Sequence, residues 1–202
     1  MSTIRLHNIY MHTTALGPGT RIAIWLQGCK RHCKGCMSPK SRPLNGGRIV
    51  DLDALIEVIC AAEDVEGVTI SGGEPFLQLQ PLYKLLKEVK KRTTLGIIIY
   101  TGNTMDELRQ MNDPTVDEII TSLADLIIDG EYVDELNDGC SLKGSSNQTV
   151  NFISDRYLPY RALYEGRERN VQIEVADGEA FFIGVPDRDT FESWRKAADD
   201  LC

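Results

Sequence analysis

The chain has 202 residues, of which 42% are hydrophobic and 26% are charged, a composition typical of one globular unit with a sizeable core. Its 22 Lys and Arg against 30 Asp and Glu give a net charge of −8, which argues against a general affinity for nucleic acid or for an anionic membrane. No apolar run approaches the roughly 20 residues that cross a bilayer, and the N-terminus lacks a secretory signal, so we expect a cytoplasmic protein.

Strand and helix patterns alternate along the first three quarters of the chain. Short apolar runs predict strands over 21–27, 67–70, 96–100, 122–128 and 148–153. Helical spacing predicts helices over 51–63 and 81–92, and two short helices follow, one capped by Thr104 with Glu107 and one beginning at Pro114. This alternation predicts parallel βαβ units with ligands at the carboxyl ends of the strands.

The last fifty residues change character. Residues 171–175 and 180–185 flank Asp177-Gly178, which predicts a β-hairpin. Asp187 or Asp189 is expected to cap a final helix whose apolar side carries Phe191, Trp194 and Ala198. We therefore expect a main unit over 1–155 and a C-terminal extension over 156–202.

The six cysteines are unevenly spaced. Cys29, Cys33 and Cys36 fall within eight residues as C-x3-C-x2-C, whereas Cys60, Cys140 and Cys202 are far apart. This distribution argues against a disulfide framework and favours metal binding by the clustered thiols. Cys60 extends the apolar face of the helix predicted over 51–63.

Three clustered cysteines point to one kind of metal site more than to others. A closed zinc or iron–sulfur site needs four protein ligands, whereas three thiolates on a four-iron cluster leave one iron open. His32 as a fourth ligand, or a structural zinc site completed by Cys60 or Cys140, is the alternative that the spacing makes less favourable.

A glycine-rich element, Ser71-Gly72-Gly73-Glu74-Pro75, follows the strand predicted over 67–70. Its glycines permit a close backbone approach to a ligand, and Glu74 can support an ammonium group. An ordinary tight turn before Pro75 is the alternative, but it explains neither the carboxylate nor its position at a strand end.

Together, the two motifs resemble those of radical S-adenosylmethionine (SAM) enzymes. Within that superfamily the chain resembles the activases of anaerobic ribonucleotide reductase. Five segments carry this resemblance: Gly17-Pro18-Gly19-Thr20-Arg21, Cys33-Lys34-Gly35-Cys36, Tyr100-Thr101-Gly102, Ile128-Asp129-Gly130 and Gly144-Ser145-Ser146-Asn147-Gln148. The resemblance implies an α/β fold, an incomplete (β/α) TIM-type barrel with the C-terminal hairpin and helix as an extension.

The resemblance also implies cofactors and site residues. A [4Fe-4S] cluster is expected on Cys29, Cys33 and Cys36, with SAM beside it. Gly35, Cys36 and Met37 would lie against the adenosine, Gly72, Gly73 and Glu74 would hold the methionyl amine, and Thr101 and Asp129 would contact the ribose or a cation.

The implied activity is reductive cleavage of SAM to generate a glycyl radical on an anaerobic ribonucleotide reductase, the expected partner. The alternative is a radical SAM enzyme that modifies a peptide or small molecule directly, with the extension as its recognition element. Lys30, Arg31 and Lys34 make the cysteine loop basic, which we interpret as a solvated face. They could instead attract an acidic electron donor such as flavodoxin.

Overall fold

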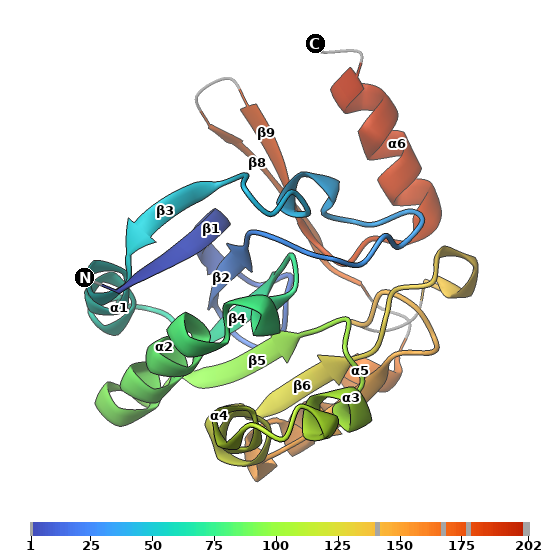
Figure 1. The fold of residues 1–202 in the computed structure, drawn as a ribbon. Coiled ribbons are helices and arrows are strands. Elements are labelled where there is room, and N and C mark those ends of the chain that lie inside the picture. Colours follow the sequence, from blue (N-terminus) through green and yellow to red (C-terminus); the bar gives the residue numbers. More distant parts are fainter. Residues whose placement is uncertain (1, 140–141, 167–168, 177–178, 200–202) are drawn as a thin grey trace.

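A computed structural model describes residues 2–139, 142–166, 169–176 and 179–199 (Figure 1). Seven of the described strands form one sheet in the order β3-β1-β2-β4-β5-β6-β7, and two form a separate hairpin, β8-β9. The strands of the large sheet are β1 (Thr3–Thr13), β2 (Arg21–Leu26), β3 (Arg48–Asp51), β4 (Gly67–Gly72), β5 (Gly96–Tyr100), β6 (Leu126–Asp129) and β7 (Thr149–Phe152).

The centre of the sheet is parallel and its margins are antiparallel. β2, β4, β5 and β6 pair in parallel in that order, as the alternation of strands and helices predicts. β1 and β3 on one side and β7 on the other pair antiparallel to their neighbours. The sheet is therefore an open α/β sheet with a parallel core. β1 and β3 were not predicted from the sequence.

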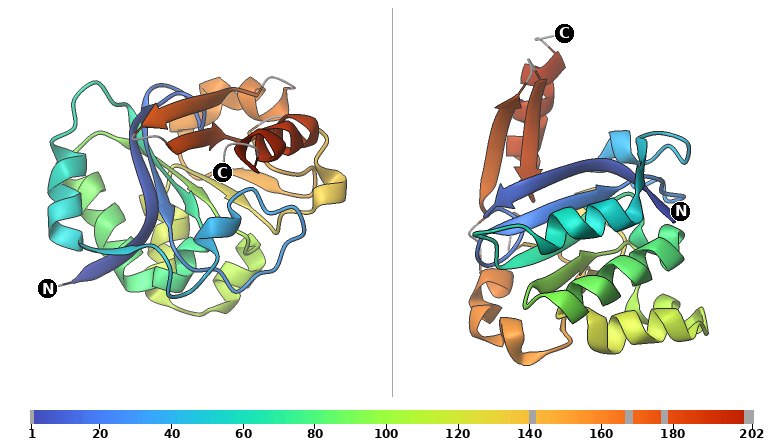
Figure 2. Two further views of the ribbon diagram at one scale, coloured as in Figure 1. Left: turned by 90° about the horizontal axis from the view of Figure 1, so that it is seen from above. Right: turned by 90° about the vertical axis from the view of Figure 1, so that its left-hand side faces the viewer.

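Four helices cover one face of the sheet (Figures 1 and 2). They are α1 (Leu52–Cys60), α2 (Leu79–Arg92), α3 (Met105–Gln110) and α4 (Pro114–Glu118). Alternate strand residues such as Ile22, Val68 and Ile97 face these helices in the main hydrophobic core. Each such buried side chain contributes about 1.5–3 kcal/mol to stability.

The caps predicted for the short helices are confirmed. The Thr104 side chain accepts from the Glu107 backbone N–H, and the Glu107 carboxylate accepts from the Thr104 N–H, which completes a capping box. Pro114 stands in the first turn of α4, where the missing N–H costs nothing. In contrast, the strand predicted over 122–128 is wrong at its start. A π-helical turn, Ile119–Leu123, precedes it, and β6 begins only at Leu126.

The opposite face of the sheet is covered by later parts of the chain. The 3-10 helix Asp155–Tyr160 and α5 (Arg161–Glu165) place Tyr157 and Tyr164 against β5 and β6. The Tyr157 hydroxyl accepts a 2.8 Å hydrogen bond from Arg21, which is fully buried and whose other donors all go to neutral oxygens. The start of the predicted extension thus packs directly on the sheet.

The predicted hairpin and final helix are confirmed as β8 (Val171–Ala176), β9 (Glu179–Gly184) and α6 (Arg188–Asp199). The turn dipeptide Asp177-Gly178 lies outside the described residues. The Asp187 carboxylate accepts from the Thr190 N–H at 2.8 Å, so Asp187 rather than Asp189 caps α6.

The hairpin projects from the body of the protein beside α6 (Figure 2). It is joined to β1 through hydrogen bonds from Thr13 to Gln172 and from Tyr10 to Glu174. No helix in the described part of the chain has the length and apolar character needed to cross a membrane.

Candidate functional site

Four loops meet at one edge of the sheet, where the parallel strands end (Figure 1). Leu26 at the end of β2 pairs with Gly72 at the end of β4, and Tyr100 at the end of β5 pairs with Ile128 in β6. This register brings together the cysteine loop, the Gly-Gly-Glu turn and the loops that follow β5 and β6. The sequence pattern predicts that the polar motifs lie at the carboxyl ends of the strands, and the structure confirms this position.

The cysteine loop carries three half-buried free thiols, Cys29, Cys33 and Cys36. Burial raises the pKa of Cys29, and the neighbouring Cys36 adds to that rise. For Cys33, burial and a 3.3 Å hydrogen bond from its thiol to Glu131 raise the pKa to about 12, and both other thiols contribute. The three thiols therefore share one partly buried loop.

This donor set fits a thiophilic metal cluster. Thiolates gathered in a partly buried loop repel one another, and a bound cation removes that cost. Cys60 lies at the C-terminal end of α1, and Cys140, the other residue that could complete a zinc site, lies outside the described residues. The three thiols of the loop match a cluster that keeps one iron open. Within residues that the structure describes, no three His, Cys, Asp or Glu side chains already stand in a metal-binding arrangement, so ligation by these cysteines stays a prediction.

The start of the cysteine loop is fixed by backbone hydrogen bonds. Gly28 N–H donates to Ser41 at 2.7 Å, and the Gly28 carbonyl accepts from the Glu74 N–H at 2.8 Å. A Cβ atom on Gly73 would lie 2.1 Å from that same Gly28 oxygen. The sequence interpretation assigned the space at Gly73 to a ligand. In the structure, backbone atoms of Gly28, next to Cys29, occupy this space.

Glu74 ties the ends of β4 and β5 together. Its carboxylate accepts hydrogen bonds from the Thr101 hydroxyl at 2.8 Å, the Gly102 N–H at 2.9 Å and the Phe76 N–H at 3.1 Å. Burial raises the pKa of this carboxyl, and the three hydrogen bonds oppose that rise. Since a carboxylate has about four acceptor positions, one position remains for a further donor.

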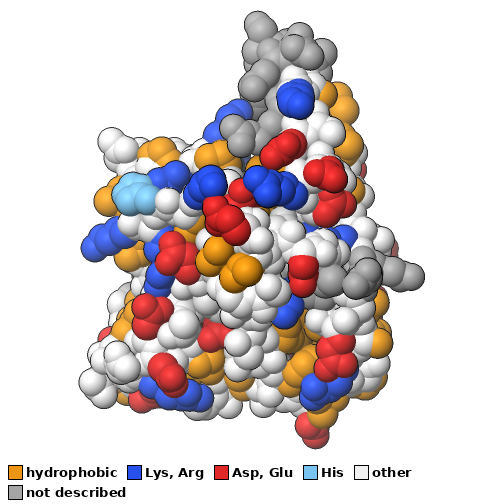
Figure 3. All heavy atoms as spheres, turned by 90° about the vertical axis from the view of Figure 1, so that its right-hand side faces the viewer, with side chains coloured by type: hydrophobic (Ala, Val, Ile, Leu, Met, Phe, Trp, Pro, Cys, Tyr) orange, Lys and Arg blue, Asp and Glu red, His pale blue; other side chains and the backbone are white. Residues whose placement is uncertain are grey.

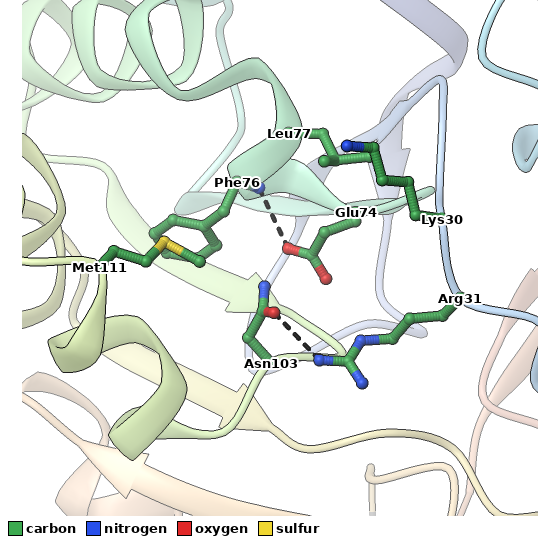
Figure 4. A pocket seen from close by; sticks show the side chains of 7 residues that line it. All are labelled: Lys30, Arg31, Glu74, Phe76, Leu77, Asn103 and Met111. Carbon is green, nitrogen blue, oxygen red and sulfur yellow. Dashed lines mark hydrogen bonds between the residues drawn. The ribbon is translucent and has the colours of Figure 1, made fainter.

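A cavity of about 280 Å³ opens beside Glu74 (Figure 4). It is lined by Lys30, Arg31, Glu74, Phe76, Leu77, Asn103 and Met111. Figure 4 shows Glu74, Asn103 and Arg31 on one side of the cavity and the apolar Phe76 and Met111 on another. The cavity therefore joins an acidic group and hydrogen-bonding groups to an apolar wall, a combination that suits a small zwitterion with an aliphatic part.

Arg31 links the cysteine loop to the loops after β5 and β6. Its guanidinium donates to Asn103 and Glu107, both at 3.0 Å, and to Glu131 at 3.3 Å. The side chain is only 25% exposed, so its interpretation as part of a solvated face is wrong. Lys34, in contrast, is exposed and pairs with Glu135.

The remaining predicted site residues lie in different surroundings. Asp129 is buried and accepts from the Met105 N–H at 2.6 Å and from Asn151 at 3.0 Å, so its carboxylate holds the start of α3. Gly35 has φ +68° and lies against Asp134. Met37 packs in the small core that includes Tyr100 and residues of the C-terminal extension.

Sequence patterns did not reveal Arg31, Asn103 and Glu131 as site residues. Glu131 directly follows Ile128-Asp129-Gly130, and Asn103 directly follows Tyr100-Thr101-Gly102, so adjacency to these segments was the available signal. Their importance depends on hydrogen bonds from Arg31 to Asn103 and to Glu131, which lie 72 and 100 residues further along the chain.

The segment Gly144–Gln148 supports the loop that carries Glu131. The Gln148 side-chain oxygen accepts from the Gly144 and Ser145 N–H groups, and its amide nitrogen donates to the Gly130 carbonyl at 2.7 Å. The hydroxyl of the fully buried Ser145 accepts from the Val133 N–H. The segment thus acts on the site indirectly, by fixing the loop after β6.

Replacing Gln148 with alanine should lower the free energy of unfolding by about 1–3 kcal/mol, because three backbone groups lose a partner. Chemical denaturation measures this change. Gln110→Ala, at an exposed position of α3, is the matched control and should change stability by less than about 0.5 kcal/mol. Equal stability of Gln148→Ala and the unmodified protein would contradict the supporting role.

Comparisons with known proteins agree on one family. Residues 15–151 match the family described as "4Fe-4S single cluster domain". The chain is 30% identical over 159 residues to the anaerobic ribonucleoside-triphosphate reductase-activating protein of Salmonella typhimurium, across 74% of this chain and 99% of that protein. The protein of the same name from Escherichia coli K12 is 28% identical, across 73% and 97%.

Among solved structures, QueE from Escherichia coli is similar with a TM-score of 0.41 and 20% identity, across 50% of this chain and 54% of that one.

Proposed function

The chain belongs to the family of anaerobic ribonucleoside-triphosphate reductase-activating proteins. From this premise we propose that it is a radical SAM enzyme, which cleaves SAM reductively at a [4Fe-4S] cluster to place a glycyl radical on such a reductase. The observation that carries the proposal is the junction of the two motifs. The Glu74 N–H donates to the Gly28 carbonyl, immediately before Cys29. The thiol loop and the Gly-Gly-Glu turn therefore form one site.

In this proposal Cys29, Cys33 and Cys36 would hold the cluster, and a set of three thiolates would leave one iron without a protein ligand. When bound, the cluster supplies the single electron that splits SAM into methionine and a 5′-deoxyadenosyl radical, which takes one hydrogen atom from the partner's glycine. The protein contributes binding and orientation. Glu74 offers its remaining acceptor position and its negative charge to the methionyl ammonium.

Other residues are assigned to the remaining parts of SAM. The methionyl chain would run along the apolar wall of the cavity at Phe76 and Met111. Gly35 and Met37 would lie against the adenosine, and Thr101 would hold Glu74 in place. Asp129 would act through the start of α3, because its carboxylate accepts from the Met105 N–H there.

We also propose that the open sheet is the incomplete barrel expected for radical SAM enzymes. Helices cover one face of it, and the site lies at its mouth, where the parallel strands end (Figure 1). A hydrogen must be taken from a carbon within about 3–4 Å of the radical, so a glycine-bearing loop of the reductase must enter this mouth. Flavodoxin is the proposed electron donor.

One observation favours a second candidate function. The hairpin and α6 lie beyond residue 151, where the family match ends. Residues outside the shared part can recognise a different substrate, so direct modification of a peptide or small molecule is the alternative.

The test uses the iron-loaded, reduced protein with SAM. We expect 5′-deoxyadenosine and methionine in equal amounts, and with the cognate reductase a glycyl-radical doublet by electron paramagnetic resonance. The doublet should vanish when the partner's radical glycine is replaced by alanine. Deoxyadenosine formation that rises with an added peptide, with no glycyl radical on the cognate reductase, would support the alternative.

A further inference from the structure

Charge is distributed unevenly along the chain. The first 50 residues contain eight Lys and Arg, all three His, and no Asp or Glu. All 30 acidic residues therefore fall in the remaining 152, together with only 14 basic ones. An acidic protein thus carries one basic segment, and that segment includes the cysteine loop.

The two sides of the cysteine loop differ in charge. On the side of the loop after β6, Arg31 pairs with Glu131 and Lys34 pairs with Glu135. On the other side, neither Lys40 nor Arg42 forms an ion pair with a carboxylate among the residues that the structure describes. The same holds for Lys30, which lines both the cavity beside Glu74 and the hollow on this side. The positive charge is therefore neutralised on one side of the loop and remains uncompensated on the other.

A hollow of about 520 Å³ lies on the uncompensated side, lined by Cys29, Lys30, His32, Arg42, Leu44 and two prolines. Leu44 is 58% exposed there, and Lys40 is exposed on the 3-10 helix Pro39–Ser41, which contributes Pro39 to the lining. In Figure 3, a histidine lies beside Lys and Arg side chains at the upper left edge of the face that is drawn. We call this hollow, with Lys40 at its margin, the basic hollow.

We propose that the basic hollow is the docking surface for an acidic protein that carries one-electron reducing equivalents. This inference rests on the proposed function, in which the cluster must gain one electron for each SAM cleaved. The donor is oxidised by one electron as the cluster is reduced by one. Cys29, a proposed cluster ligand, lines the hollow, so a donor seated here would stand directly beside its acceptor.

Charge complementarity favours an acidic protein as the occupant of the basic hollow. Uncompensated cations around an exposed apolar residue attract an acidic face and accelerate its encounter, as transient redox complexes with small interfaces require. The large reductase is assigned to the opposite side of the loop, where its glycine must meet SAM. Separate surfaces allow electron delivery while the partner is bound.

The experiment measures flavodoxin with the iron-loaded protein and its Lys40→Glu variant. Binding of oxidised flavodoxin should weaken at least tenfold at low salt in the variant, and the difference should shrink at high salt. The rate of cluster reduction by flavodoxin hydroquinone should fall in parallel. Reduction by dithionite, a small reagent, should be unchanged, and Leu44→Ser should weaken flavodoxin binding with little salt dependence.

Lys91→Glu on α2 is the matched control, because it makes the same charge change at an exposed position outside the basic hollow. Equal flavodoxin affinity in Lys40→Glu and Lys91→Glu would overturn the proposal. The proposal would also be overturned if a single-stranded oligonucleotide displaced flavodoxin from the unmodified protein at a concentration lower than that at which the oligonucleotide binds to other parts of the protein. If the dithionite-reduced protein fails to cleave SAM, the proposed function is contradicted instead. The two failures are distinguishable because flavodoxin binding is measured without turnover.

Discussion

Replacing Cys33 with alanine should reduce the iron content after anaerobic reconstitution from about four atoms per chain to nearly none. Three thiolates are the smallest set that holds a four-iron cluster with one open iron, so no ligand is dispensable. Cys29→Ala and Cys36→Ala should have the same effect. Iron and sulfide analysis with the visible absorption of the cluster measures the loss, and cleavage of SAM should disappear with it.

Cys60→Ala is the control for this prediction. Cys60 ends α1 and packs against the helix-covered core, so its replacement should leave the iron content unchanged and cost only packing energy. Tightly bound zinc without iron in the reconstituted protein would contradict the cluster assignment. Loss of iron in Cys60→Ala would restore the alternative of a site completed by that residue.

The parts of the fold that the sequence predicts are those encoded locally. The capping box of Thr104 and Glu107 and the N-terminal Pro114 act within one turn, and the structure confirms both. The run over 119–128 is mostly apolar and is interrupted only by Thr121, Ser122 and Asp125, so its pattern does not distinguish a helical turn from a strand. The structure divides it between the two, and its Asp125 carboxylate accepts from the Ile97 N–H of β5.

The site divides in the same way. The cysteine spacing and the Gly-Gly-Glu turn are local motifs, and strand order alone brings them together. The partners of Arg31 come from loops after β5 and β6, so they become visible only once the sheet is assembled. Likewise, the sequence shows that Gly73 needs space but does not show what fills that space.

Gly73→Ala should destabilise the protein by about 3 kcal/mol and lower the unfolding midpoint by about 6–12 °C. The new Cβ would lie 2.1 Å from the Gly28 oxygen, a backbone atom that cannot move without breaking the Glu74 N–H bond. Because Gly28 immediately precedes Cys29, iron retention should fall together with stability. Thermal unfolding of the iron-free protein and iron analysis after reconstitution measure the two effects separately.

Gly102→Ala is the matched control at the end of the next strand. Its added Cβ would meet the Arg31 Cδ at 2.8 Å, and that flexible side chain can move aside. We expect a stability change of less than about 1 kcal/mol, since only rotamer adjustment is required. If Gly73→Ala instead kept full stability and iron content but lost SAM affinity, the space at Gly73 would belong to the ligand, as the sequence interpretation holds, and not to the Gly28 backbone.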